Sequence, residues 1–458
     1  MRRGLRCFRA SGAFRLPSFT VAGLVDVETD PPRAVRLSVR STLDQVKSGS
    51  HRGIAIHVKA GRRRRPHGLV DLTPAVADYS RIRVLHLVAG NMFGGVETML
   101  VTLARLTASV QSMTSVFGVT SEGRLSAELR EAGAIVHDLG EVRLRNPRSV
   151  LRARTSLASL LREEYFDVVI CHSSWPKVVF GRVVRQLELP LVVWQHGPFI
   201  GKRMLDRMAI RSAPDLYITN SQFTARTIEK HAAGAQTAIL HYPVQLATVD
   251  NRSICRDRIR AELGTSATCT VIVQVSRIEP WKGHVLHIRA LANLSPDVDW
   301  RCWVVGGPQT KAEQNYAESL RVLVRRLGIE DRVDFLGQRS DVASLLNAAD
   351  VHCQPNTGPE AFGITFVEGL AAGLPVVTTD MGGGVEVVTS SCGIVVPPDD
   401  ISALTNALET LCRDESLRHR LGRAGPARAA ELCDPHRQMR RLQELLTGVA
   451  QRRGELHA

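Results

Sequence analysis

Two cations follow a buried apolar run in the second half of the chain. Ser276 and Arg277 lie near the end of the run 270–278, and Lys282 stands before Gly283 in the loop that follows. An Arg side chain offers a planar fork of donors and a Lys ammonium offers a point charge, a combination that suits a diphosphate. A solvated loop with incidental charges would give the same pattern.

Two carboxylates stand further along the chain. Glu360 precedes an apolar helical run and Glu368 is embedded in that run, where a charge is costly unless it has a partner. A fully helical spacing of this length spans ~12 Å, comparable with the reach from a ribose across a diphosphate to a sugar. Carboxylates are natural acceptors for sugar hydroxyls. The alternatives are a dipole role for Glu360 and a structural salt bridge for Glu368.

A glycine pair stands in the first half. Residues 81–90 predict a buried strand, Gly94-Gly95 lies in the loop after it, and residues 96–106 have helical apolar spacing. Free N–H groups at a helix start suit a phosphate, although a flexible turn would look the same. The spacing is not G-x-G-x-x-G, so a dinucleotide fingerprint is absent.

These residues need a scaffold that brings loop ends together, and the rest of the chain predicts one. Apolar strands alternate with amphipathic helices in two series, with a lapse near residues 245–265. The expected strands are 81–90, 115–120, 166–172, 189–196 and 216–220, then 270–278, 300–306, 332–336, 350–354, 374–379 and 393–396. Repeated βα units predict an α/β fold with two doubly wound parallel sheets. Ligands bind outside the carboxyl ends of such strands, so two facing domains would share a cleft.

Together the motifs resemble the donor-site pattern of the family 4 retaining glycosyltransferases, which have the GT-B fold of two facing Rossmann-like domains. The resemblance covers about residues 81–445 and rests on Ser276-Arg277, Lys282-Gly283, Glu360-x7-Glu368, Gly373-Leu374-Pro375-Val376-Val377, Gly382-Gly383-Gly384, Gly94-Gly95-Val96-Glu97 and Gln195-His196-Gly197. Gly369 stands where many members carry Ala, and Val385-Glu386 stands where Pro-Glu is frequent.

The resemblance implies a role for each matching residue. Arg277 and Lys282 would hold the donor diphosphate, Glu368 the ribose hydroxyls and Glu360 the hydroxyls of the transferred sugar. His196 would lie beside that sugar. The implied catalytic residues are His196, Glu360, Arg277 and Lys282, and the implied donor-binding residues are Gly94, Gly95, Ser276, Arg277, Lys282, Glu360, Phe362, Gly363, Ile364 and Glu368.

The implied reaction moves a hexose from a nucleotide-diphosphate sugar to a hydroxyl, with retention at the anomeric carbon. The leaving phosphate would help to deprotonate the acceptor, so neither a protein nucleophile, a cofactor nor an essential metal is expected. The implied partners are a nucleotide sugar and a saccharide or lipid-linked acceptor, in polysaccharide, lipopolysaccharide or glycolipid synthesis. Domain closure over the donor is expected to assemble the site.

The expected domains are a basic extension (1–80), an acceptor domain (81–250), a donor domain (251–434) and a C-terminal helix that crosses back to the first domain (435–458). Residues 1–80 hold 15 Lys and Arg against 6 Asp and Glu. Their Pro and Gly break every periodic pattern, which favours a tail, a leader peptide or a start codon placed too far upstream.

Two further motifs hold residue types that could do chemistry. Asp297-Val298-Asp299 has metal-binding spacing, but it precedes a strand at the amino edge of the sheet and is read as loop acid. His172 ends a strand that faces the expected cleft and could touch the acceptor, although a hydrogen-bonded structural histidine is favoured.

Composition limits the class of protein. With 458 residues, 44% of them hydrophobic, and a formal net charge of +14, chain-wide disorder and fibrous repeats are excluded. No run approaches the ~18 apolar residues of a spanning helix. The nine scattered cysteines form no C-x-x-C pair, which predicts a reducing compartment and a cytoplasmic location.

Basic segments raise the option of an anionic membrane surface that holds a lipid-linked acceptor. One is the set Arg143, Arg145, Arg148, Arg152 and Arg154; the other, residues 199–211, mixes Ile200, Met204, Leu205 and Met208 with Lys202, Arg203, Arg207 and Arg211. Ordinary Arg-rich helix surfaces are the alternative. This option would place the protein at the inner face of the cytoplasmic membrane.

Two rival functions remain at this stage. One is another GT-B enzyme, such as a nucleotide-sugar epimerase or a phosphorylase. The other is a basic nucleic-acid-binding protein, against which the Arg runs lack interleaved aromatics and no recognition module is present. No nucleic-acid partner is therefore expected.

Overall fold

A computed structural model describes residues 81–90, 92–109, 113–201, 204–245 and 252–457. The predictions made for residues 1–80, for Lys202 and Arg203, and for the middle of the connection at 246–251 lie outside these described residues.

The first half of the described chain builds a parallel sheet of seven strands in the order β3-β2-β1-β4-β5-β6-β7. The strands are β1 (Ile82–Val88), β2 (Met113–Val119), β3 (Ile135–Asp138), β4 (Val168–His172), β5 (Leu191–Gln195), β6 (Leu216–Thr219) and β7 (Thr237–Ile239). The helices between them are α1 (Gly95–Ser109), α2 (Arg124–Glu131), α3 (Pro147–Glu163), α4 (Ser174–Gln186), α5 (Met204–Ala209) and α6 (Gln222–His231).

The second half builds a parallel sheet of six strands in the order β10-β9-β8-β11-β12-β13. The strands are β8 (Thr270–Val275), β9 (Trp300–Val305), β10 (Val333–Gly337), β11 (Val351–Gln354), β12 (Val376–Thr379) and β13 (Gly393–Val396). The helices are α7 (Arg252–Glu262), α8 (His284–Ala292), α9 (Lys311–Arg326), α10 (Val342–Ala348), α11 (Ile364–Ala371), α12 (Gly384–Val387) and α13 (Ile401–Arg413), with 3₁₀ turns η1 (Pro280–Lys282) and η2 (Glu330–Arg332).

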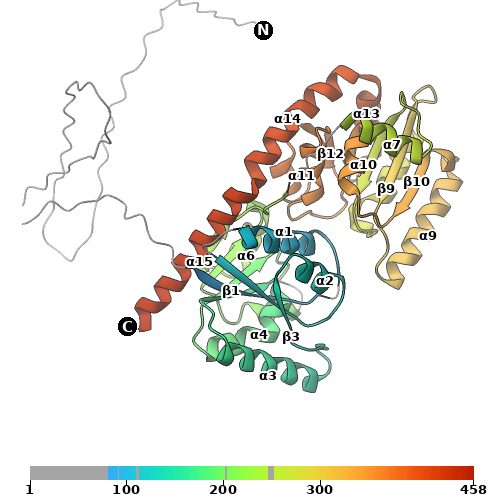
Figure 1. The fold of residues 1–458 in the computed structure, drawn as a ribbon. Helices are drawn as coiled ribbons and strands as arrows, with labels where there is room; N and C mark the ends of the chain where they lie inside the picture. The colour runs from blue at the N-terminus through green and yellow to red at the C-terminus, as the bar shows by residue number, and fades with distance from the viewer. Residues whose placement is uncertain (1–80, 91, 110–112, 202–203, 246–251, 458) are drawn as a thin grey trace, which may run out of the picture. The chain divides into compact units, whose positions relative to one another are not determined.

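Helices cover both faces of each sheet, which is why the central strands are largely apolar. In the first sheet, α3 and α4 pack on one face and α1 packs on the other (Figure 1). In the second sheet, the core on one face includes residues of α8, α9 and α13, and the core on the other face includes residues of α7 and α10. The prediction of an α/β fold with two doubly wound sheets is confirmed.

The chain ends in two long helices, α14 (Glu415–Cys433) and α15 (Pro435–His457). Helix α14 contacts α11, whereas α15 contacts α1 and β4 of the first sheet. The apolar side chains of Met439, Leu442, Leu446 and Val449 on α15 are buried in the same cluster as Ile82 of β1. The last helix therefore packs on the first half of the chain.

Two strands of the first sheet were not predicted. Strands β3 and β7 are short and lie at its two edges, and no residue in either is fully buried. An edge strand packs on fewer neighbours, so its apolar pattern is weak. No helix among the described residues is long and apolar enough to cross a membrane.

Candidate active site

The loop after β8 carries the two predicted cations. Ser276 and Arg277 follow the strand directly, and η1 ends at Lys282. Gly283 has φ 76°, and a Cβ there would lie 1.7 Å from the carbonyl oxygen of Pro355, just after β11. Only glycine permits this approach, which holds Lys282 against the carboxyl edge of the sheet.

Lys282 meets the first of the predicted carboxylates. Its Nζ lies 2.6 Å from Oε2 of Glu360, and it also lies 3.9 Å from the centroid of the Trp281 ring. Glu360 is fixed from behind, because its Oε1 accepts from the backbone N–H of Ala361 and its carbonyl accepts from the N–H of Gly383. The side chains of the pair are 14% and 11% exposed, so the charges are largely withdrawn from water.

Arg277 is held by carboxylates that the sequence did not single out. Its Nη2 lies 2.6 Å from Oε1 of Glu313 on α9 and 3.3 Å from Oε1 of Glu279. Burial opposes the charge of Glu313, but hydrogen bonds from the Gln309 N–H and from Arg277 outweigh it and lower the pKa of this carboxyl. Glu313 also belongs to the N-terminal capping box of α9 with Thr310. The sequence around Glu313 indicates only a helix-capping role, so its contact with Arg277 was not predicted.

The glycine loop of the first half touches these residues. A Cβ on Gly94 would lie 3.5 Å from Cδ of Arg277, and one on Gly95 would lie 3.3 Å from Cδ1 of Ile364. The N–H of Gly94 donates to Oε2 of Glu97, whose pKa is raised by burial. The structure thus brings the start of α1 next to Arg277 and the start of α11.

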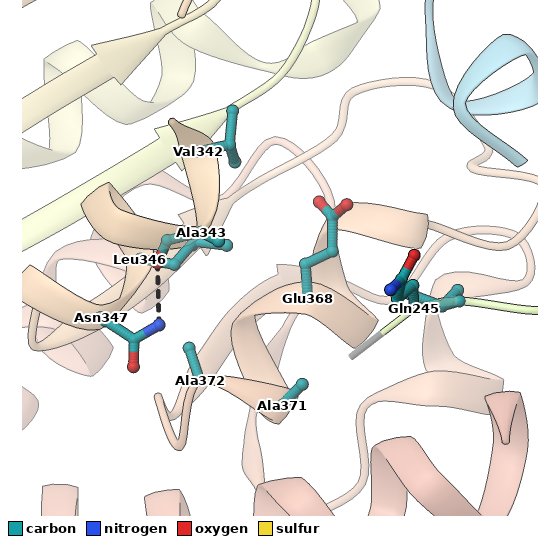
Figure 2. A pocket seen from close by; sticks show the side chains of 9 residues that line it. Gln245, Val342, Ala343, Leu346, Asn347, Glu368, Ala371 and Ala372 are labelled. Carbon is teal, nitrogen blue, oxygen red and sulfur yellow. Dashed lines mark hydrogen bonds between the residues drawn. The ribbon is translucent and has the colours of Figure 1, made fainter. Parts of the chain in front are cut away.

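Glu368 lines a different space from Glu360. It projects from α11 into a small pocket between residues of α10 on one side and Gln245 on the other (Figure 2). Burial raises the pKa of the Glu368 carboxyl to about 7. A half-buried carboxylate at the wall of this pocket would be stabilised by hydroxyl donors.

Phe362 and Gly363 lie between the two carboxylates and serve the packing of this segment. The Phe362 ring meets Tyr242 edge-on and stacks on His241. Gly363 has φ 90°, and a Cβ there would lie 2.3 Å from the Phe366 ring. The Phe362 ring is therefore a packing group in this structure.

His196 follows β5 and is hydrogen-bonded through both ring nitrogens. Its Nδ1 lies 2.8 Å from Tyr242 Oη, and its Nε2 lies 2.8 Å from Nδ1 of His172. Asn220 Nδ2 donates to both Tyr242 Oη and the carbonyl of His196. His172 is thus the hydrogen-bonded histidine that the sequence favoured, and its ring is 3% exposed.

The remaining candidates stand apart from these residues. Asp297 pairs with Arg413 of α13 through Oδ2 and Nη1, 2.8 Å apart, next to the amino end of β9. Arg154 of the basic set donates to the carbonyls of Val178 and Val179, so it serves the packing of α3 on α4.

Two doubly wound sheets, with paired cations at the edge of one and a glycine loop from the other, are the arrangement of a GT-B glycosyltransferase. Residues 256–428 match the model of glycosyl transferases group 1, and residues 93–247 match that of glycosyltransferase family 4. The chain belongs to this family, as the motifs predicted.

Curated relatives agree in class. The chain is 32% identical over 216 residues to the D-inositol 3-phosphate glycosyltransferase of Corynebacterium kroppenstedtii, an alignment covering 43% of this chain and 48% of that protein. It is 29% identical over 310 residues to the GDP-mannose-dependent monoacylated alpha-(1-6)-phosphatidylinositol monomannoside mannosyltransferase of Corynebacterium glutamicum, covering 62% and 78%. The chain thus spans about half the length of the first of these relatives.

A solved structure has the same fold. HepE of Anabaena, in complex with UDP and glucose, superposes with a TM-score of 0.71 at 25% identity, covering 80% of this chain and 100% of that one. The ligand roles assigned above to individual residues stay predictions.

Proposed function

We propose that the protein transfers a hexose from a nucleotide-diphosphate sugar to a hydroxyl acceptor, with retention at the anomeric carbon and without an essential metal. Lys282, Arg277 and the start of α1 would receive the diphosphate, Glu360 the sugar and Glu368 the ribose. The function falls within glycolipid or polysaccharide synthesis.

The observation that carries this proposal is the close meeting of Lys282 with Glu360, beside Arg277 and the Gly94 loop. Departure of a nucleoside diphosphate develops negative charge on its phosphates. Two cations and a helix N-terminus placed in advance stabilise that charge, and the carboxylates that now hold the cations keep them oriented until a diphosphate competes for them.

The donor and acceptor classes follow from the relatives' names. One relative is named for GDP-mannose and a phosphatidylinositol mannoside, another for inositol 3-phosphate, and HepE was solved with UDP and glucose. We therefore favour a GDP- or UDP-hexose as donor and an inositol-containing or lipid-linked saccharide as acceptor.

A screen of nucleotide sugars by thermal stabilisation tests the donor assignment. UDP- and GDP-hexoses are compared with their nucleoside diphosphates and with NAD, which the absent dinucleotide fingerprint predicts to be inert. Stabilisation by NAD alone would overturn the assignment.

The reaction is tested by product analysis with the donor that stabilises best. Nucleoside diphosphate should appear in step with a new glycoside whose anomeric configuration equals that of the donor, and chelators should leave the rate unchanged. An epimerase or a phosphorylase would form no such glycoside together with a nucleoside diphosphate. An inverted anomer would contradict retention, and loss of activity with a chelator would contradict metal independence.

Peripheral membrane binding is the finer proposal for the acceptor side. Met204 and Met208 on α5 are 72% and 42% exposed, and Ile200, four residues before the helix, is 42% exposed. Arg207 on α5 and Arg211, just after it, are also exposed. On and before α3, Leu151 and Leu144 are exposed among arginines. Exposed apolar groups flanked by cations suit an anionic lipid surface.

Sedimentation with vesicles should show binding to anionic but not to neutral lipid, and equal binding to both would reject an electrostatic attachment.

A further inference from the structure

A line of buried polar side chains crosses the first sheet and ends at Tyr242, whose ring meets that of Phe362 in the segment between Glu360 and Glu368. Ser115 Oγ lies 3.2 Å from His86 Nε2, His86 Nδ1 lies 3.0 Å from His172 Nε2, and His172 Nδ1 lies 2.8 Å from His196 Nε2. His196 Nδ1 completes the line at 2.8 Å from Tyr242 Oη. We call these five residues the imidazole chain.

Strand register explains the line. His86 on β1 is opposite Phe117 of β2 and Ile170 of β4, and His172 on β4 is opposite Trp194 of β5. Ser115, His172 and His196 are thus each displaced by two residues from the position directly opposite the neighbouring histidine. Residues two apart on a strand point to the same face, and diagonal neighbours lie within reach of ring side chains. The parallel sheet therefore places the three histidine rings in a diagonal row that ends with His196 at the carboxyl edge of the sheet.

The hydrogen bonds of the imidazole chain all donate in one direction. A neutral imidazole has one donor and one acceptor nitrogen, so the role chosen at one link fixes the role at every other link. Tyr242 Oη already accepts from Asn220 Nδ2, 2.8 Å away. Among the described residues, the acceptor within reach of the Tyr242 hydroxyl proton is His196 Nδ1. If that proton goes to His196, then all three histidines carry their own proton on Nε2, and His86 donates to Ser115.

Burial keeps the rings neutral. His86, His172 and His196 are 0%, 3% and 7% exposed, and burial is the largest cause that lowers the pKa of each, to about 3 for His86 and His196. The backbone also holds the middle ring, because Ser173, directly after His172, has φ 77° and its N–H donates to the carbonyl of Trp194. A non-glycine residue in this region persists only where its surroundings hold it there.

We propose that His86 and His172 are positioning residues for His196, fixing its ring beside the donor site as a neutral imidazole with the proton on Nε2. This inference rests on the proposed function for its catalytic meaning. With both ring nitrogens engaged, His196 offers the sugar a rigid ring, not a proton donor or a base.

Imidazole ¹⁵N spectra of the full chain, labelled on histidine, test the proton positions without any substrate. Single substitutions at residues 86, 172 and 196 assign the signals. All three rings should be neutral at pH 7 with protonated Nε2, and His86→Leu should shift the signals of His196 although the two residues do not touch. Protonated Nδ1 in any of the three, a charged ring, or an unmoved His196 signal in His86→Leu would overturn the proposal.

Kinetics test the positioning role. His86→Leu and His172→Leu should each lower kcat about tenfold or more with the donor KM changed less than twofold, because the diphosphate contacts are untouched. His86→Asn keeps an acceptor near the place of Nδ1 and should restore most of kcat. His352→Leu is the matched control, since His352 is equally buried in the second sheet, where neither ring nitrogen has a partner among the described residues.

The outcomes separate the two proposals. If the wild-type protein forms no glycoside from any donor, the proposed function fails. The spectra still test the proton positions in the imidazole chain. If the control loses kcat as much as the variants do, or if His86→Leu keeps full kcat, the positioning role is rejected.

Discussion

At the scale of single residues, the proposed site consists of cations that are paired with anchored carboxylates. Lys282 and Arg277 each contact a carboxylate that is itself anchored, Glu360 by the backbone of the following residues and Glu313 by the cap of α9. A largely buried pair of this kind is weak evidence for stability, because its desolvation offsets its attraction, but it fixes geometry that a ligand can use.

Lys282→Ala should lower the proposed turnover at least 100-fold, because it removes a cation aimed at the charge that develops on the leaving diphosphate. The change should be measured as kcat/KM for the best donor, with the thermal midpoint as a check on folding. Arg289→Ala, an exposed cation on the neighbouring helix α8, is the control and should keep full activity. Normal turnover in Lys282→Ala would remove the basis of the donor-site assignment.

From the raised pKa of Glu368 we expect opposite effects of pH on stability and on donor binding. Its pKa of about 7 in the folded protein lies above the ordinary value of 4.5, so ionisation of Glu368 lowers the free energy of unfolding. This loss of stability is complete above pH 7 and disappears as the pH falls to about 4.5. Glu368→Gln should therefore unfold at higher urea than the wild type at pH 8, by on the order of 2 kcal/mol, with the gain fading toward pH 4.5.

The same substitution should weaken donor binding at pH 8, because a carboxylate accepts two ribose hydroxyls better than an amide does. In the wild type, donor affinity should fall as the pH drops below 7, where the carboxyl takes up a proton. Calorimetric titration at several pH values measures this. A donor affinity equal in the two proteins at pH 8 would argue against a ribose contact.

Residue types and spacing singled out Lys282, Glu360 and Glu368 as candidates, and the family resemblance gave them roles that stay predictions. Residue types and spacing were not enough to find the partners. Glu313 carries an ordinary capping signal, and Asn220 and Tyr242 become visible only when the strands are aligned. His86 did give a signal, a polar residue within the apolar strand run, that could have been used.

At the scale of elements, glycines decide how closely segments approach. Gly369 on α11 stands where many family members carry Ala, and the structure gives the reason: a Cβ there would lie 2.6 Å from Nδ1 of His352 on β11. Histidine on the strand and glycine on the helix therefore fit as a pair.

Gly369→Ala should destabilise the protein by about 1–3 kcal/mol through overpacking, and adding His352→Val should recover most of that loss. Urea unfolding of the two single variants and the double variant measures the coupling. Gly448→Ala on α15 is the control, because its Cβ would meet Arg452 at an ordinary 3.5 Å, and it should be neutral or stabilising. Additive effects of the Gly369 and His352 substitutions would disprove the pairing.

The central elements were predictable from sequence and the marginal ones were not. Strands such as β4 and β5 are buried at every position, and such apolar runs stand out. Strand β3 has Ile135 half exposed and β7 has three half-buried residues, so their sequences resemble loops. Hydrogen bonding to an existing sheet, which sequence patterns do not report, is what makes them strands.

At the scale of the whole described chain, the two sheets are joined by side chains as well as by the connection between them. Ser221 Oγ donates to the carbonyl of Ala361, and the carboxylate of Glu386 accepts from the N–H groups of Gln222 and Phe223 at the start of α6. A carboxylate there is favoured by the helix dipole. Glu386 therefore links the second half of the chain to the start of α6.

The last helix gives a further connection and a test of how cooperatively the two halves unfold. Leu446 on α15 is fully buried in the apolar cluster that holds Ile82 of β1 together with Phe362 and Leu370 of the second half. Leu446→Ala should cost about 3 kcal/mol and, because it weakens a cluster shared by both halves, should split one calorimetric unfolding transition into two. Arg441→Ala, which breaks only an exposed pair with Glu444, should leave a single transition within about 1 kcal/mol of the wild type. If Leu446→Ala also keeps one transition at the wild-type temperature, then α15 does not couple the halves, and their coupling depends on other contacts between them, such as those of Ser221 and Glu386 and that of Tyr242 with Phe362.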